Sequence, residues 1–510
     1  MAKSNVNYDF MLLSSRDNVG VAAFDCLPKG AVLQVDGGDV VLRDDIRFGH
    51  KFALREIREG APVLKYGQSI GIARRGIAAG EHVHVDEIRY IGESNTFSID
   101  NSVQSAGGFE ALPGMFFGYP RANGRVGTRN YIAVVSPVNC SAAVVKKITR
   151  FFEDGANAKN IDGVVPVTYG GGCAQAFNSR SHHVICETIA GWIDHPNVVA
   201  AVVVGLGCET VNIKSVLEKI PEQHQKNVRS FNIQDTGGTK KAVDYGVNII
   251  NELLDALPVF EREEVSVEHL TLGLNCGGSD AFSGLTANPA LGIASDILVS
   301  KNGVAVLAET PECNGAEEYL ISRCVKSEDK EKLRGIVGWW AEYASHHRVE
   351  MNDNLSKGNM EGGISTILEK SLGAVAKAGR APIQKVLNYA ERIEQSGLMF
   401  MDTPGFDPVS VTGLVAGGCN IVAFTTGRGS LFNASIAPTV KISTNSEMKN
   451  RLSGDMDFDA GVILRGGSIE EAGADIYREI ISVANGKQTK GEEQRMGSEE
   501  FVPWQFGEIL

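Results

Sequence analysis

The sequence predicts an α/β protein in which a small β-rich N-terminal unit precedes two Rossmann-like domains built on parallel sheets. Compact runs of valine, isoleucine and leucine alternate with helical patterns over most of the chain, and strands that are apolar on both faces are typical of parallel sheets. The 58 glycines, against only 16 prolines, provide for many tight turns between strands and helices. With 510 residues, the chain is long enough for more than one domain.

Residues 1–97 are predicted to form the β-rich unit. Short apolar stretches in this part of the chain are separated by glycine, proline and charged residues, as in a series of strands and turns. Residues 98–118 are rich in serine and glycine and show no clear period, which indicates a linker.

Residues 119–262 and 263–510 are predicted to form the two α/β domains. Their buried strands are expected in the runs NYIAVVSPV, IDGVVPVTY, NVVAAVVVGL, HLTLGLN, GVAVLAE, GLMFMDTP and CNIVAFTTG. Most of these runs lead into a glycine-containing loop and then a helical pattern. Ligand sites in parallel sheets lie beyond the carboxyl ends of the strands, so the loops after these runs are the expected place of a functional site.

Composition and charge limit the possible partners. The net charge of −13 argues against nucleic acids and anionic membranes, so a small anionic substrate would need a local positive site. Neither a signal peptide nor an apolar run of membrane-spanning length is visible, and the nine cysteines lack the regular spacing of a disulfide framework. A reduced, cytoplasmic setting is therefore expected, and a homo-oligomer is expected as well.

Four cysteines follow predicted strands, at Cys140, Cys173, Cys208 and Cys276, and three of them lie beside glycine. Thiolates on converging loops could hold iron, zinc or an iron–sulfur cluster. Free cysteine is also a small side chain that is often buried, and the spacing is not a local C-x-x-C motif, so packing is the alternative for each cysteine.

Three histidines of the β-rich unit are candidates for acid–base chemistry or metal binding. His82 and His84 are two residues apart, so in a strand both side chains would point to the same face. His50 lies in the short sequence RFGHK. The alternative for the pair is a solvent-facing position on a strand.

Two glycine-containing loops could bind an anionic substrate through backbone N–H groups and polar side chains. The residues concerned are Gly277, Gly278, Ser279, Asp280, Thr425, Thr426 and Gly427. Arg428 in the second loop could bind a carboxylate with both arms of its guanidinium group. Arg125 and Arg129, which precede the first strand of the α/β region, are either further anion contacts or surface charges. No dinucleotide fingerprint or Walker loop is present.

Read together, several long strings resemble the altronate and galactarate dehydratases, a family that includes sulfolactate sulfo-lyase relatives. The N-terminal strings are DNVGVA, GHKFAL, KYGQSIG and GEHVHV, and they resemble the small β-clip (SAF-like) substrate-binding domain of that family. The later strings are GYPRANGRVGTRNYIAV, GLGCE, CGGSDAFSGLTANPALG, SKGNMEGGISTILEKSLGAVAK, MDTPGFDPVSVTG and FTTGRGS, and they resemble its catalytic region. The altronate branch is the more similar one. Tyr169 departs from the family pattern, which predicts an altered substrate.

The resemblance implies a hydro-lyase that converts a sugar acid or related hydroxy acid to a 2-keto-3-deoxy acid, and it implies activation by a divalent metal, Fe²⁺ or Mn²⁺. Such a reaction removes the proton next to the carboxylate and then expels the β-hydroxyl group, so it needs a base, an acid and stabilisation of an enediolate. His50, His82 or His84 would supply the base, and Arg428 would grip the carboxylate. A carbon–sulfur lyase that releases sulfite from a sulfolactate-like substrate is the second hypothesis, and a non-catalytic sugar-acid sensor is the third.

Overall fold

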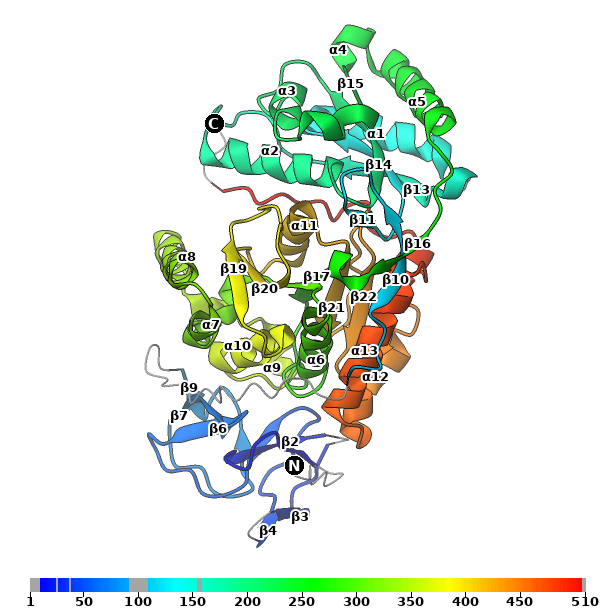
Figure 1. Cartoon of the computed structure of the whole chain (residues 1–510). Coiled ribbons are helices and arrows are strands. Elements are labelled where there is room, and N and C mark those ends of the chain that lie inside the picture. Colours follow the sequence, from blue (N-terminus) through cyan, green and yellow to red (C-terminus); the bar gives the residue numbers. More distant parts are fainter. Residues whose placement is uncertain (1–9, 24–25, 36–37, 91–108, 154–157, 507–510) are drawn as a thin grey trace.

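The computed structural model describes residues 10–23, 26–35, 38–90, 109–153 and 158–506. It has a β-rich module at one end of the molecule, a seven-stranded α/β unit in the middle and a four-stranded α/β unit at the other end (Figure 1). The predicted order of a β-rich unit and two parallel α/β sheets is therefore confirmed. None of the described helices is both long and apolar enough to cross a membrane.

The β-rich module is made of short antiparallel strands. Its four-stranded sheet has the order β1-β2-β5-β8, with β1 (Phe10–Met11), β2 (Val19–Ala22), β5 (Lys51–Ala53) and β8 (His82–Val83). A three-stranded sheet, β6-β7-β9, and a hairpin, β3-β4, complete it, with β3 (Val32–Val35), β4 (Gly38–Val41), β6 (Pro62–Lys65), β7 (Gln68–Ala73) and β9 (Ile88–Arg89).

A small antiparallel sheet joins the two α/β units. Its order is β11-β10-β16, with β10 (Met115–Pro120), β11 (Val126–Gly127) and β16 (Glu263–Ser266). Of the predicted linker 98–118, residues 98–108 lie outside the described residues, whereas the end of the linker forms the first part of β10.

The four-stranded unit is a parallel sheet of order β13-β12-β14-β15. Its strands are β12 (Tyr131–Ser136), β13 (Gly163–Thr168), β14 (Val198–Gly205) and β15 (Val228–Asn232). Its helices are α1 (Asn139–Thr149), α2 (Arg180–Ile193), α3 (Ile213–Leu217), α4 (Ile233–Thr236) and α5 (Thr239–Ala256). Valines and alanines fill β14 because the strand is buried on both faces.

The seven-stranded unit is a parallel sheet of order β19-β20-β18-β17-β21-β22-β23. Its strands are β17 (Thr271–Cys276), β18 (Val304–Leu307), β19 (Ile383–Leu387), β20 (Gly397–Met401), β21 (Ile421–Thr426), β22 (Thr439–Ser443) and β23 (Phe458–Asp459). Its helices are α6 (Ala287–Ser300), α7 (Glu317–Arg323), α8 (Ser327–His346), α9 (Lys357–Glu361), α10 (Ile367–Val375), α11 (Asp407–Gly417), α12 (Ser446–Arg451), α13 (Ile469–Ala484) and α14 (Lys490–Glu493).

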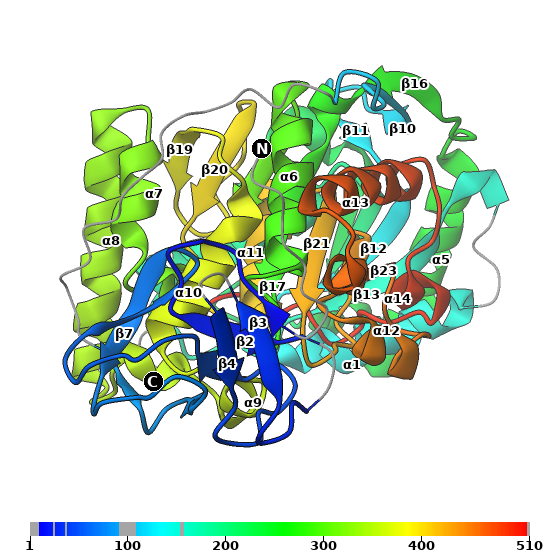
Figure 2. The same ribbon diagram turned by 90° about the horizontal axis from the view of Figure 1, so that it is seen from below.

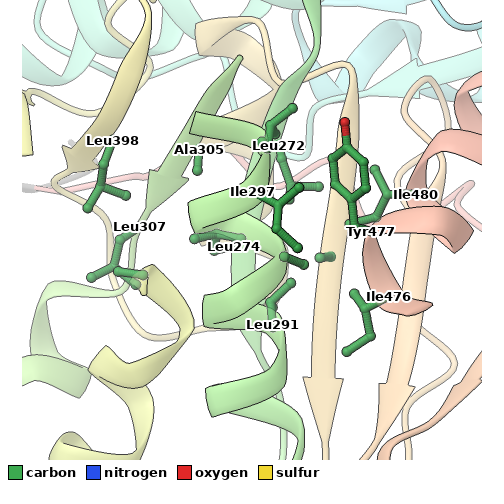
Figure 3. Close-up of a cluster of buried hydrophobic side chains, with 14 of the residues drawn as sticks. Leu272, Leu274, Leu291, Ile297, Ala305, Leu307, Leu398, Ile476, Tyr477 and Ile480 are labelled. Carbon is green, nitrogen blue, oxygen red and sulfur yellow. The ribbon is translucent and has the colours of Figure 1, made fainter. Parts of the chain in front are cut away.

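Helix α6 anchors the core of this unit. Leu291 and Ile297 of α6 pack between the leucines of β17 and the apolar face of α13, which presents Ile476 and Tyr477 (Figure 3). This buried cluster fixes the central strands, and with them the loops at their carboxyl ends. Helices α9 and α10 lie between these loops and the β-rich module (Figures 1 and 2).

Buried charges attach the β-rich module to α10. Both carboxylate oxygens of Glu369 are paired, with Lys51 at 3.0 Å and with Lys65 at 2.7 Å. All three side chains are excluded from solvent, at 0%, 0% and 2% exposure for Glu369, Lys51 and Lys65. The ammonium of Lys51 also donates to the carbonyl oxygen of Gly363, at 2.6 Å. The two lysines lower the pKa of Glu369 to about 2, against the opposing effect of burial.

Candidate active site

The three predicted histidines lie together at the boundary between the β-rich module and the seven-stranded unit. Strands β5 and β8 are antiparallel, with Lys51 opposite Val83 and Phe52 opposite His82. The same register puts His50 opposite His84. The ring centroids lie 4.8 Å apart for His50 and His84, 5.2 Å for His50 and His82, and 5.7 Å for His82 and His84. The sequence spacing therefore gathered three imidazoles, as the strand geometry predicts.

A hydrogen-bonded relay fixes which nitrogen of His82 is free of hydrogen. Nε2 of His50 lies 3.3 Å from the carbonyl oxygen of Glu361, and Nδ1 of His50 lies 3.0 Å from Nε2 of His82. Because a carbonyl oxygen only accepts, the hydrogen of neutral His50 is on Nε2 and its lone pair is on Nδ1. His82 must then donate from Nε2, which leaves the lone pair of neutral His82 on Nδ1.

All three rings are held neutral. Burial lowers the pKa of His50 to about 4 and the pKa of His84 to about 3, and it lowers the pKa of His82 in the same direction. The positive charge of Lys51 adds to the effect on His82 and His84. Neutral imidazoles can accept a proton or bind a metal ion at physiological pH.

We expect the rings of His50 and His84 in the metal-free protein to show no protonation step between about pH 5 and pH 8. Their folded-state pKa values lie below the ordinary value of 6.5, so the unfolded chain binds more protons between pH 6.5 and about pH 4. The free energy of unfolding should therefore fall as the pH decreases through this window. NMR titration of the ring C–H signals, with urea unfolding at each pH, measures both effects; a ring midpoint near 6.5 would contradict the buried, neutral state.

The histidines line a pocket of about 510 Å³ that helix α9 closes on its other side. The residues around it are Asp45, Arg47, His50, His82, His84, Lys357, Met360 and Glu361. His84 is tied to the same segment, since its Nδ1 lies 3.1 Å from the hydroxyl oxygen of Ser365. Both basic and acidic groups therefore face a space of the size that small-molecule sites require.

The two predicted glycine loops are adjacent because β17 and β21 are neighbouring strands. The N–H of Gly277 donates to the carbonyl oxygen of Thr425, at 2.9 Å, and the N–H groups of Gly427 and Arg428 donate to the carbonyl oxygen of Gly278. A Cβ at Gly427 would overlap the carboxyl group of Asp280, so only glycine allows this approach.

Several predicted substrate contacts in these loops are already used within the protein. The carboxylate of Asp280 accepts from Ser283 and Phe282 at one oxygen and from Thr444 and Asn445 at the other. The hydroxyl of Thr425 donates to Asn288, that of Thr426 accepts from the N–H of Gly429, and the carbonyl oxygen of Ser279 accepts from Asn359. These groups shape the loops, and their bonding argues against the direct substrate contact predicted for Asp280 and Thr425.

Arg428 contacts helix α9, which also borders the histidine pocket. Its guanidinium group lies 3.8 Å from the carboxylate of Glu361, whose backbone carbonyl accepts from His50. The side chain of Arg428 is 47% exposed, so the guanidinium group can still take up a further anion. Glu361 thus contacts both Arg428, the predicted carboxylate-binding residue, and His50, one of the predicted bases. The sequence alone did not point to Glu361.

The prediction that four cysteines share one metal site is corrected by the sheet topology. Cys140, Cys173 and Cys208 follow strands of the four-stranded sheet, whereas Cys276 ends β17 of the seven-stranded sheet. Cys276 is buried, and burial raises the pKa of its thiol to about 12. Within the described ranges, no three His, Cys, Asp or Glu side chains are grouped so that they could hold a metal ion.

Arg125 and Arg129 are also placed away from the pocket. Arg125 pairs with Asp194 at 2.7 Å, and both arms of the buried Arg129 guanidinium bind Glu492 of α14. Arg129 further donates to the carbonyl oxygens of Val483 and Lys487. The predicted substrate role of these arginines is replaced by a structural one, because Arg129 ties the four-stranded unit to the C-terminal part of the chain.

A second charged cluster lies at the carboxyl ends of β17, β18 and β20, and most of its residues belong to no local sequence motif. Lys377 pairs with Glu309 at 2.7 Å and Lys370 pairs with Glu312 at 2.8 Å, all within the protein interior. Burial, together with the charges of the two glutamates, raises the pKa of Asp407 to about 8. The raised pKa favours the protonated form of Asp407; its position after a predicted strand is the one signal that the sequence offered.

Comparison with known proteins supports the whole length of this arrangement. Models of the altronate/galactarate dehydratase SAF domain, the D-galactarate dehydratase/altronate hydrolase second domain and the D-galactarate/altronate dehydratase C-terminal domain match residues 8–90, 118–258 and 267–509.

Three curated relatives show the same pattern. Altronate dehydratase of Escherichia coli (strain K12) is 36% identical over 490 residues, which cover 95% of this chain and 96% of that protein. Galactarate dehydratase (L-threo-forming) of the same organism is 32% identical over 489 residues, which cover 94% of this chain and 93% of that protein. The beta subunit of (2R)-sulfolactate sulfo-lyase of Chromohalobacter salexigens is 30% identical over 391 residues, which cover 76% of this chain and 96% of that subunit. The alpha subunit of the same enzyme is 34% identical over 90 residues, which cover 16% of this chain and 96% of that subunit. The chain therefore belongs to the altronate/galactarate dehydratase family of hydro-lyases.

Proposed function

We propose that the protein dehydrates a sugar acid of the altronate type in the pocket formed by His50, His82, His84 and helix α9. The relay from the carbonyl oxygen of Glu361 through His50 to His82 carries this proposal, because it leaves a basic lone pair on a residue that lines the pocket. Nδ1 of His82 would take the proton next to the substrate carboxylate, and the relay would hold the resulting imidazolium in place.

Positive charge around the pocket suits an anionic substrate. Arg47 and Lys357 line the space. Arg428 lies 3.8 Å from the lining residue Glu361 and offers a planar fork that can bind a carboxylate with two hydrogen bonds. The same groups would stabilise the negative charge that develops on the carboxylate when the α-proton leaves. The β-hydroxyl group then takes up the proton held by the His82 imidazolium and leaves as water, which yields the enol of a 2-keto-3-deoxy acid and returns His82 to its neutral form.

A divalent metal, Fe²⁺ or Mn²⁺, is part of the proposal. Both nitrogens of His50 take part in the relay, and the lone pair of His82 is assigned to the base, so His84 is the imidazole that could ligate the metal, through the nitrogen that does not face Ser365. The remaining ligands would have to come from the hydroxy acid and water. When bound, such a metal would act as a Lewis acid toward the substrate oxygens.

Substrate screening combined with a base variant tests this function. The protein is purified without oxygen, its metals are measured, and aldonates, aldarates and sulfonates are screened for 2-keto acid formation and for exchange of the α-proton with deuterium. We expect a sugar acid to be dehydrated, and we expect His82→Gln to lower kcat by about 10²–10⁴ and to suppress the exchange. Binding without turnover in every substrate class would leave the sensor hypothesis instead, and undiminished exchange in His82→Gln would remove His82 as the base.

Carbon–sulfur cleavage is the second candidate function. The chain covers 96% of each subunit of the (2R)-sulfolactate sulfo-lyase, and that reaction would use the same α-proton abstraction with sulfite as the leaving group. Sulfite release from sulfolactate, without 2-keto acid formation from sugar acids, would favour it.

A further inference from the structure

Three of the predicted metal-ligating cysteines meet at one edge of the four-stranded sheet. Cys140 lies in the first turn of α1, directly after β12, while Cys173 follows β13 and Cys208 follows β14. These three strands are neighbours in the order β13-β12-β14 and run in parallel, so their carboxyl ends lie side by side. This is the edge at which α/β sheets bind ligands, and it belongs to the unit farthest from the histidine pocket (Figure 1).

Hydrogen bonds between the loops hold the three thiols in place. The N–H of Asn139 donates to the carbonyl oxygen of Gly171, at 2.9 Å, and the N–H of Val211 donates to that of Gly172, at 3.0 Å. Gly172 has a φ of +95°, and a Cβ there would overlap the carbonyl oxygen of Pro137. The loop that carries Cys173 is thus bound to the loops that carry Cys140 and Cys208.

Glu209 positions Cys208 and is itself unavailable as a ligand. Its buried carboxylate accepts from the N–H groups of Leu206 at 3.1 Å, Gly207 at 2.7 Å and Cys208 at 2.9 Å. These bonds close the turn GLGCE around the carboxylate and leave the thiol of Cys208 on the outside, where it is exposed. The glutamate of this sequence string therefore has a structural role.

All three thiols are exposed, whereas Cys186, Cys313, Cys324 and Cys419 pack in apolar cores and the buried Cys276 lies beside Glu309 and Lys377. The thiols come from loops that end three neighbouring parallel strands and are hydrogen-bonded to one another, which brings them to one edge of the sheet. Apolar packing thus accounts for four of the buried cysteines, but it gives no reason for three exposed thiols on one edge.

We propose that Cys140, Cys173 and Cys208 ligate an iron–sulfur cluster in which one iron has no protein ligand. Soft thiolates favour iron–sulfur clusters or zinc, and no three such side chains in the described chain are close enough for one shared ion. A cluster spans more space than a single ion because bridging sulfides separate its irons. Three thiolates, each of which loses its proton on ligation, would leave the fourth iron of a [4Fe–4S] cluster open to an external oxygen ligand such as a hydroxyl group or carboxylate.

Metal and sulfide analysis of the full-length protein tests the cluster independently of turnover. The protein is purified anaerobically and reconstituted with ferrous iron, sulfide and a thiol reductant, and iron, acid-labile sulfide, visible absorption and EPR after reduction are then measured. We expect close to stoichiometric cluster in the wild type. Each of Cys140→Ser, Cys173→Ser and Cys208→Ser should lower bound iron by about tenfold or more, since losing a ligand costs at least as much as losing an outer contact.

Cys26→Ser is the matched control, because Cys26 is also an exposed free thiol but lies in the β-rich module. Circular dichroism of each variant before reconstitution separates loss of the cluster from loss of the fold, and a variant that fails to fold is replaced by the smaller Cys→Ala change. Stoichiometric zinc in place of iron and sulfide, absence of a cluster in the wild type, or equal cluster content in the three variants and Cys26→Ser would each overturn the proposal.

Discussion

Replacing Glu369 by glutamine is expected to lower the free energy of unfolding by about 3–5 kcal/mol. The substitution keeps the shape of the side chain but removes the single negative charge that faces both Lys51 and Lys65. Two ammonium groups would then remain in a site from which solvent is excluded, and an uncompensated buried charge is far more costly than a broken surface pair. The β-rich module should lose its attachment to α10, and with it the three histidines should leave the pocket.

Urea unfolding and hydrogen exchange measure this effect. The matched control is Glu218→Gln, which removes the same charge from an exposed pair with Lys214 and should change stability by less than about 1 kcal/mol. Exchange protection should decrease first in the β-rich module, since its attachment is what the substitution weakens. A change below 1 kcal/mol for Glu369→Gln would show that the buried lysines release their protons or reach water.

Acid should act on the same attachment. The pKa of Glu369 lies near 2 in the folded protein, below its ordinary value of 4.5, so the ion pairs are fully present above pH 4.5 and are lost as the pH falls toward 2. The stability difference between wild type and Glu369→Gln should therefore shrink in this acidic window.

Replacing Arg428 by glutamine is expected to reduce kcat/KM by about 10²–10³ while leaving the fold intact. The guanidinium group is 47% exposed and lies 3.8 Å from Glu361, so it remains available to bind the substrate carboxylate. Glutamine cannot supply the charge or the forked pair of hydrogen bonds, so stabilisation of the developing enediolate would be lost. Arg428→Lys should recover only part of the activity, because lysine offers charge without the fork.

Steady-state kinetics on the best substrate, with thermal unfolding in parallel, measures the Arg428 effect. Arg334→Gln is the matched control: its side chain is also 47% exposed and paired with glutamates, but it lies on α8. A large fall in kcat/KM for both variants would indicate a general charge effect, and wild-type kinetics for Arg428→Gln would remove the arginine from the reaction.

The sequence predicted most of the framework because its signals are local. Valine-rich runs such as β14 are buried on both faces, and the two-residue spacing of His82 and His84 placed both rings at one edge. The glycine loops after β17 and β21 could be recognised for the same reason, since close backbone contact there requires glycine.

The remaining parts of the site depend on contacts between distant segments. Glu369 and Lys370 are neighbours in an ordinary helical sequence, yet one pairs with the β-rich module and the other with Glu312. Arg129 resembles a surface charge until α14 brings Glu492 to it, 363 residues further along the chain. Cys276 follows a strand just as Cys208 does, and only the strand order shows that the two belong to different sheets.

Noncovalent contacts hold the β-rich module on the rest of the protein, among them the pairs of Lys51 and Lys65 with Glu369 of α10. Where two parts of a protein already bind each other, joining them in one chain acts mainly by raising the effective concentration of each part around the other. An ancestral gene could be divided at that boundary, or two genes fused there, with little disturbance to the assembled enzyme. The sulfolactate sulfo-lyase relative, with its separate alpha and beta subunits, is consistent with such an exchange between one-polypeptide and two-polypeptide forms.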